Sequence, residues 1–273
     1  MANEAMHYKD PLEDYCKEAH VEGIIRVLTS QATSHAGTAR AQVKNYAIRS
    51  LKNHHKQNAQ KLYTVAVDLC LSDNNSAQEV GVIILADFLG GHEQEVERIL
   101  HTLANAENWE VREWVASACG RILAQQFSLF YPVMASWAQD ESEKVRRAVA
   151  LALMYAGKTR NANYTDRILD LIEALLADRS PYVRDNLGPF AIGAGLIKYY
   201  PEPVIARMRE WVRSENEQVR WNVAMVFSAA EGAKHAPTAK IVIDILHRDE
   251  SPYVKRAVAK AVKTITKRYP DFF

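Results

Sequence analysis

The sequence contains little cysteine, and its cysteines are widely separated. Cys16, Cys70 and Cys119 are odd in number, and the last two lie in apolar helical stretches, as buried free thiols usually do. Their spacing fits neither a disulfide framework nor a metal site. We therefore expect a reducing compartment, no bound metal and no cofactor.

Long apolar runs are also absent. No stretch of about 18 apolar residues, the length needed to cross a membrane, occurs in the 273 residues. The first twenty residues carry acids and histidines where a signal peptide has a basic and then an apolar stretch. We expect a cytoplasmic protein that has no membrane partner.

An excess of either charge is missing as well. The 34 Lys and Arg residues nearly balance the 33 Asp and Glu residues, which gives a formal net charge of +1. This total does not indicate nucleic-acid binding, although a repeat protein can gather one sign of charge on one face. Gly/Ser linkers and low-complexity tracts are lacking too, so residues 1–273 are expected to form a single domain.

The sequence does contain a short element that recurs at near-constant intervals of 34 to 38 residues. Each unit holds two helical stretches, and a period of this length predicts HEAT-like repeats, which bury their apolar faces only by stacking. We predict an all-α, right-handed superhelical solenoid of about seven two-helix repeats. The recurring elements are Val43-Lys44, Ala77-Gln78, Val111-Arg112, Val145-Arg146, Val183-Arg184, Val219-Arg220 and Val254-Lys255.

The basic residues of these elements form a ladder along the predicted stack. Second helices of HEAT-like repeats line the concave surface, where such a ladder would follow a phosphate backbone. The alternative is structural, because an Asp five residues before the valine can cap the helix or pair with the following arginine. The candidates for backbone contact are Lys44, Arg112, Arg146, Arg184, Arg220 and Lys255.

The unit around Val111 differs most from the others. Trp109 and Glu113 lie four residues apart, so they share one face of the second helix, opposite its core stripe. An indole offers its face to a flat cationic substrate, and a carboxylate stabilises positive charge that develops during a reaction. The alternative is that Trp109 packs as a hydrophobic staple and Glu113 is a solvated helix residue.

This unit and its neighbours resemble the HEAT-like DNA alkylation repair glycosylases. Besides the tryptophan and the acid four residues later, the resemblance rests on a W-x-x-D-x-x-x-x-x-R-R-A element at 137–148 and on the stretches at 46–52 and 59–63. Members of that family excise positively charged alkylated purines from duplex DNA. The resemblance implies that Trp109 contacts the lesion nucleotide, that Glu113 is the catalytic carboxylate, and that Arg147 holds the backbone.

Two positions depart from the family pattern. Glu113 replaces the aspartate of the best-known branch, and the stretch NLGPFAIG offers only Phe190 where the family leads us to expect a tryptophan. Phe190 is therefore the candidate second aromatic. Asp185 repeats the outward position of Glu113 two units along and is a candidate second carboxylate, with local pairing to Arg184 or Arg213 as its alternative.

Two functions follow from the sequence. One is a DNA glycosylase that excises N3- or N7-alkylpurines by electrostatic stabilisation of an oxocarbenium-like sugar. The other is a non-catalytic HEAT-repeat scaffold that binds DNA or a protein partner. The glycosylase predicts a cationic groove focused on Trp109 and Glu113, whereas the scaffold predicts mixed charge and apolar patches.

Overall fold

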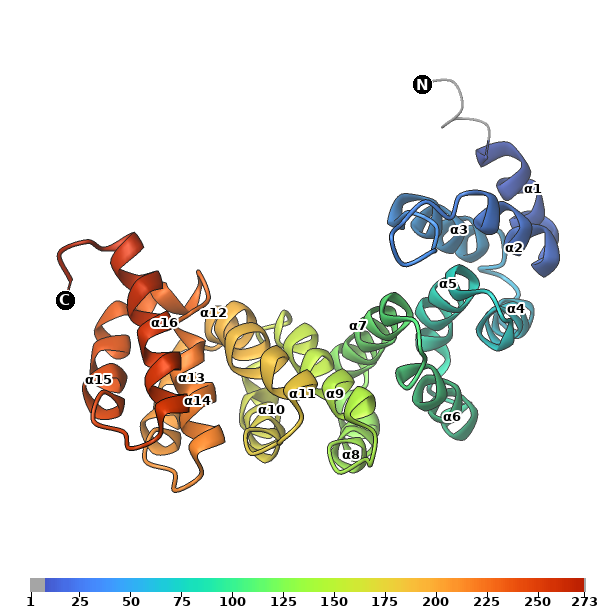
Figure 1. The fold of residues 1–273 in the computed structure, drawn as a ribbon. Helices are drawn as coiled ribbons and strands as arrows, with labels where there is room; N and C mark the ends of the chain where they lie inside the picture. The colour runs from blue at the N-terminus through green and yellow to red at the C-terminus, as the bar shows by residue number, and fades with distance from the viewer. Residues whose placement is uncertain (1–7, 273) are drawn as a thin grey trace. The chain divides into compact units, whose positions relative to one another are not determined.

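The computed structural model describes residues 8–272, which form helices joined by short turns (Figure 1). No strand occurs among these residues, only an isolated antiparallel bridge between Ala32 and Ala39. The all-α prediction is confirmed. In the same part of the chain, no helix is both long enough and apolar enough to span a bilayer.

The chain divides into two compact units, Met1–Ile122 and Leu123–Phe273. The boundary falls inside helix α7, near its C-terminal end. Each unit contains consecutive HEAT-like helix pairs, and the single domain over residues 1–273 stays a prediction.

The first unit contains a leading helix followed by helix pairs in which α2 and α3, α4 and α5, and α6 and α7 are partners. The second helices α3 and α5 pack against each other, which joins neighbouring pairs. The elements are α1 (Lys9–Glu18), α2 (Val21–Ser30), α3 (Ala41–His54), α4 (Ala59–Leu71), α5 (Asn75–Leu85), the 3-10 turn η2 (Ala86–Phe88), α6 (Glu93–Ala104) and α7 (Trp109–Gln125).

The second unit also consists of helix pairs. Its second helices are α9, the segment 181–199, α14 and α16. Its elements are α8 (Phe127–Trp137), α9 (Glu143–Gly157), α10 (Ala162–Leu175), α11 (Pro181–Asn186), the π-helix η3 (Leu187–Leu196), α12 (Ile197–Tyr199), α13 (Pro201–Trp211), α14 (Glu217–Val226), the 3-10 turn η4 (Gly232–His235), α15 (Ala236–Leu246) and α16 (Pro252–Arg268).

Polar residues in the short breaks start the second helices, as their composition predicts. The side chain of Ser142 accepts a hydrogen bond from the Lys144 N–H at the start of α9, and Asn216 does the same for Gln218 in α14. Such caps satisfy backbone groups that the first helical turn leaves unpaired. The predicted core stripe is also confirmed, since Val145, Ala148, Val149 and Ala152 are all buried.

One second helix is irregular. After Asn186 the chain continues as the π-helix η3, in which Pro189 lacks the N–H that an α-helix would use. Gly188 lets this segment approach α14 closely, because an added Cβ would lie 2.5 Å from the carbonyl oxygen of Asn222. The amide of Asn222 accepts a hydrogen bond from Gly188 N at 3.0 Å. The irregular segment leaves Phe190 41% exposed.

Candidate functional site

Trp109 and Glu113 occupy the first two turns of α7. Trp109 is 42% exposed, and Glu113, one turn further on, is half-buried. Trp109 therefore lies at the protein surface, as its spacing predicts, and is not part of the core.

A loop of the first unit packs against this end of α7. Residues 31–40 connect α2 to α3, and their carbonyl at Ala36 accepts a hydrogen bond from the Asn108 amide at 2.9 Å. The ring of His35 stacks on the indole of Trp109, with centroids 5.3 Å apart and planes inclined by 25°. One face of the indole is thus in contact with His35, a residue that no pattern in the sequence selects.

Glu110 fixes this loop to α7. Its Oε2 accepts hydrogen bonds from Thr38 Oγ1 at 2.5 Å and from Ser34 Oγ at 3.2 Å, and its Oε1 accepts one from Lys44 Nζ at 2.9 Å. Burial raises the pKa of Glu110, but the hydrogen bonds from Thr38 and Lys44 outweigh it, so the pKa lies below its ordinary value. The carboxylate is therefore ionised when it holds the loop.

Lys44 belongs to the interior of the first unit. Its fully buried Nζ lies 2.5 Å from Glu79 Oε2 and 4.7 Å from the centre of the Trp114 ring. Burial raises the pKa of Glu79 to about 7, against the lowering effect of Lys44. The proposed contact of Lys44 with a DNA phosphate is therefore wrong for this structure, because the ammonium group is enclosed by acids and an indole.

Most of the arginine ladder also has structural partners. Arg146 makes a bidentate ion pair with Asp178 of the next repeat, in which Nε and Oδ2 lie 2.6 Å apart, and Arg220 pairs identically with Asp249. Each arginine also donates through Nη1 to two carbonyls of its own preceding turn, as Arg112 does to Ala106 and Glu107.

Arg146 and Arg220 therefore have structural ion-pair partners and Arg112 has backbone partners, but the predicted pairing of each Asp with the arginine that follows it is wrong. The acid that pairs with Arg146 comes from the following repeat, not from the turn before the arginine. That acid, Asp178, also accepts a hydrogen bond from Ser180 N and so shapes the next turn. The guanidinium groups of Arg146 and Arg220 join consecutive repeats, whereas Arg112 donates to carbonyls of its own preceding turn. Their expected role as phosphate contacts is corrected accordingly.

Arg184 is an exception within the second unit. The position that holds Asp178 or Asp249 in other repeats is Ser214 in the repeat after Arg184, so no acid is offered there. Arg184 instead lies 3.0 Å from Asp185 and over the Trp221 ring at 5.2 Å. The local pairing that the sequence offered as the alternative for Asp185 is present, and Arg184 stays partly exposed.

Arg147 and Phe190, the other residues that the resemblance selects, also belong to the second unit. Arg147 is only 7% exposed, contrary to its expected outward position, and lies 4.8 Å from the centre of the Tyr182 ring. Its Nη2 donates to Asn186 Oδ1 at 3.2 Å. Lys255, the last residue of the ladder, is exposed on α16.

A family comparison covers these residues. The model of the DNA alkylation repair enzyme family matches residues 9–190, which include Trp109, Glu113, Arg147 and Phe190. The chain belongs to this family. As a family member it has a role in DNA alkylation repair, while Arg220 and α16 lie outside the matched residues. No curated protein is significantly similar to the chain.

Comparison with solved structures supports the fold through one of them. The chain is similar to smu.31 from Streptococcus mutans UA159, with 16% identity over 79% of this chain and 97% of that one and a TM-score of 0.53. It is also similar to the E. coli protein YibA, with 20% identity over 92% and 96% of the two chains and a TM-score of 0.43. At such identities the likeness to smu.31 shows the fold alone.

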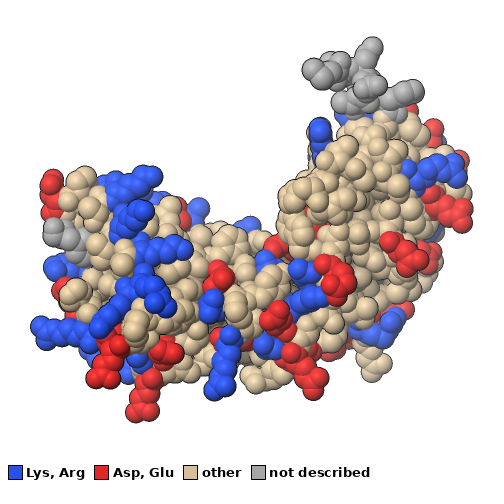
Figure 2. Space-filling model, in the orientation of Figure 1, with Lys and Arg blue, Asp and Glu red and all other residues tan. Residues whose placement is uncertain are grey.

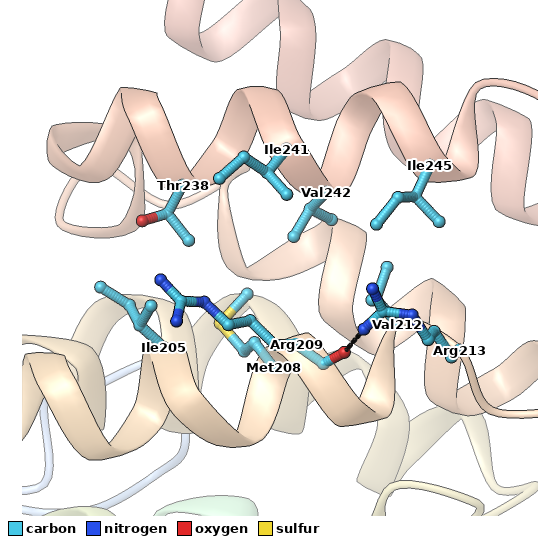
Figure 3. A pocket seen from close by; sticks show the side chains of 9 residues that line it. All are labelled: Ile205, Met208, Arg209, Val212, Arg213, Thr238, Ile241, Val242 and Ile245. Carbon is cyan, nitrogen blue, oxygen red and sulfur yellow. Dashed lines mark hydrogen bonds between the residues drawn. The ribbon is translucent and has the colours of Figure 1, made fainter.

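The second unit also carries an apolar groove between α13 and α15 (Figure 3). Isoleucine, valine and methionine side chains of the two helices face each other across it, and Ile241 is 52% exposed. The guanidinium groups of Arg209 and Arg213 border the groove, and no carboxylate lines it. A surface of this composition suits binding and offers no group for acid or base chemistry.

Proposed function

We propose that the chain is a monofunctional DNA glycosylase that excises positively charged N3- or N7-alkylpurines from duplex DNA. The observation that carries this proposal is the exposed indole of Trp109 with Glu113 one turn further along α7, in a chain of the DNA alkylation repair family. A core position for Trp109 would have removed the basis of the proposal.

The chemistry needs neither a metal nor a covalent nucleophile. When the bond between the sugar C1′ and the purine nitrogen breaks, its electron pair neutralises the charge of the alkylated base, and positive charge develops on the sugar. Glu113 stabilises this oxocarbenium-like sugar, and water then adds to C1′ with loss of a proton. Each factor of ten in rate requires about 1.4 kcal/mol of such stabilisation.

Trp109 binds the substrate in this proposal. A cationic purine gains cation–π attraction when it lies against an indole, typically about 0.5–2 kcal/mol depending on desolvation. Because His35 already contacts one face of the ring, the alkylated base contacts the part that remains exposed. The backbone contact of Arg147, the nucleotide contact of Phe190 and the second carboxylate of Asp185 stay predictions from the sequence, and this proposal does not depend on them.

The test is base release from methylated duplex DNA. We expect the native chain to release 7-methylguanine or 3-methyladenine, and Glu113→Gln to reduce release at least about 100-fold. The variant should keep its affinity for the duplex, because a neutral amide of the same shape replaces the carboxylate. Glu18→Gln, the same change at an exposed acid of α1, serves as the matched control and should release base like the native chain. Equal release by Glu113→Gln would remove Glu113 from the mechanism.

A non-catalytic scaffold is the second candidate, and the groove between α13 and α15 is the observation that favours it. Its arginine border and apolar floor fit an amphipathic helix with acidic flanks. This candidate predicts that the native chain, although folded and able to bind duplex, releases no alkylated base in the same assay.

A further inference from the structure

Helix α16 carries one sign of charge only. Between Pro252 and Arg268 it has six basic residues and no acidic one, in a chain whose formal net charge is +1. Figure 2 shows Lys and Arg side chains gathered along the course of this helix. The charges of the chain are therefore unevenly distributed, although their sum is close to zero.

Four of these cations form a stripe opposite the buried face of α16. Arg256, Lys260, Lys263 and Lys267 follow each other at intervals of four, three and four residues, so they share one face. The core side of the same helix consists of buried apolar residues. They are Val254, Ala257, Val258, Ala261 and Ile265. We call the four basic residues the α16 stripe.

The α16 stripe has no counter-charge within residues 8–272. None of its four side chains forms an ion pair or a hydrogen bond with another residue there. On the neighbouring α15, by contrast, Lys240 pairs with Asp244. Like charges at these intervals destabilise a helix by about 0.2–0.5 kcal/mol per pair. Solubility alone would be served equally by charges of both signs, so the single sign indicates an anionic ligand.

The dimensions of the stripe fit a polyanion. Eleven residues of helix separate Arg256 from Lys267, a rise of about 16 Å. Duplex DNA carries one phosphate per about 1.7 Å of its axis when both strands are counted, so a length of about 16 Å holds roughly nine phosphates. Its four cations can therefore each lie near a different phosphate.

We propose that the α16 stripe binds the phosphate backbone of duplex DNA, as an anchor that does not depend on base sequence. The choice of duplex DNA rests on the proposed function. The site is distinct from the sites predicted above. Helix α16 lies outside the residues matched by the family model, and three of the ladder arginines have structural partners. Its role is to hold the duplex, and no chemistry is assigned to it.

The test is the salt dependence of duplex binding by the full chain. Fluorescence anisotropy with an unmodified duplex compares the native protein with a variant in which all four stripe residues are glutamine. Each lost phosphate contact lowers the slope of log K against log salt by about 0.9, so we expect a slope smaller by about 3–4. Between 50 and 200 mM salt, the native affinity then falls about 100-fold more than that of the variant.

A matched control removes the same charge from exposed cations elsewhere. It carries glutamine at Lys17, Arg26, Lys56 and Lys61, and its slope should stay within about 1 of the native slope. Thermal melts verify that both variants fold. If the four substitutions in α16 prevent folding, the double variant Arg256→Gln, Lys260→Gln should show half of the expected change in slope.

Three results would overturn the α16 stripe. The first is an unchanged salt slope in the α16 variant, and the second is an equal change of slope in the control variant. The third is that the α16 variant loses binding to phosphatidylserine vesicles or to single-stranded DNA while its binding to duplex DNA is unaffected. Duplex binding and base release also separate this inference from the proposed function. A stripe-dependent slope without base release would refute the glycosylase alone, and base release with an unchanged slope would refute the stripe alone.

Discussion

Replacing Asp249 with asparagine tests whether the ladder arginines are structural. Asp249 is almost fully buried and accepts from Arg220 Nε at 2.6 Å, from Arg220 Nη2 at 3.1 Å and from Ser251 N at 2.9 Å. Asparagine keeps the shape and one acceptor but removes the charge and turns the other oxygen into a donor facing the guanidinium. Charge-assisted hydrogen bonds contribute about 1.5–3 kcal/mol each, so we expect a loss of about 2–3 kcal/mol.

Chemical denaturation and thermal melts measure this loss. For a unit of this size, about 2–3 kcal/mol corresponds to a decrease in Tm of about 4–12 °C. Asp244→Asn in α15 is the control, because its ion pair with Lys240 is exposed and such pairs contribute at most about 1 kcal/mol. Arg220→Met completes a double-mutant cycle with Asp249→Asn.

The pH dependence adds a second measurement. The hydrogen bond from Arg220 lowers the pKa of Asp249 below its ordinary value of 3.8. Its stabilisation is therefore complete above pH 3.8 and is lost as the pH falls through the lowered pKa. The native chain and Asp249→Asn should differ most above about pH 5 and converge in acid. Equal stabilities of Asp249→Asn and Asp244→Asn at pH 7, or a zero coupling energy with Arg220→Met, would refute the structural role of the ladder.

Two further predictions concern the acids around Lys44. Glu110→Gln should weaken the attachment of residues 31–40 to α7 by about 1–3 kcal/mol. Hydrogen exchange at the amides of Thr38 and Ala39 should then become faster. Glu18→Gln is the control, and equal exchange rates in the two variants would contradict the attachment. Burial raises the pKa of Glu79 to about 7, so the folded chain keeps a proton that the unfolded chain loses near pH 4.5. The free energy of unfolding should then fall by up to about 1.4 kcal/mol per unit as the pH rises from 4.5 to 7, and Glu79→Gln should abolish this slope in denaturant titrations at several pH values.

The repeats and their caps could be predicted from the sequence because they depend on near neighbours along the chain. The stripe Val145, Ala148, Val149 and Ala152 follows from helical spacing, and caps such as Ser142 are chosen within one turn. The exposed position of Trp109 follows from the same phase. Such features need no knowledge of which distant segments meet.

The contacts of the candidate site could not be predicted in this way. His35 and Trp109 are more than seventy residues apart, and Glu110 meets Thr38 only because the loop after α2 packs against α7. Helical phase also placed Arg147 outward, yet packing against Tyr182 buries it. The charge of Lys44 gave no sign of burial, since its partners come from α5 and α7.

The exception to the ladder predicts where an arginine of the second unit is available for binding. Where a repeat supplies an acid, as Asp178 does, the preceding arginine is held in a bidentate ion pair, and four of its five N–H donors are used within the protein. Ser214 stands where other repeats have that acid, and Arg184 lies instead over the ring of Trp221. Introducing the acid with Ser214→Asp should therefore draw Arg184 into the ladder, stabilise the unit and weaken duplex binding together. A gain in stability without a loss of affinity would show that Arg184 does not contact DNA.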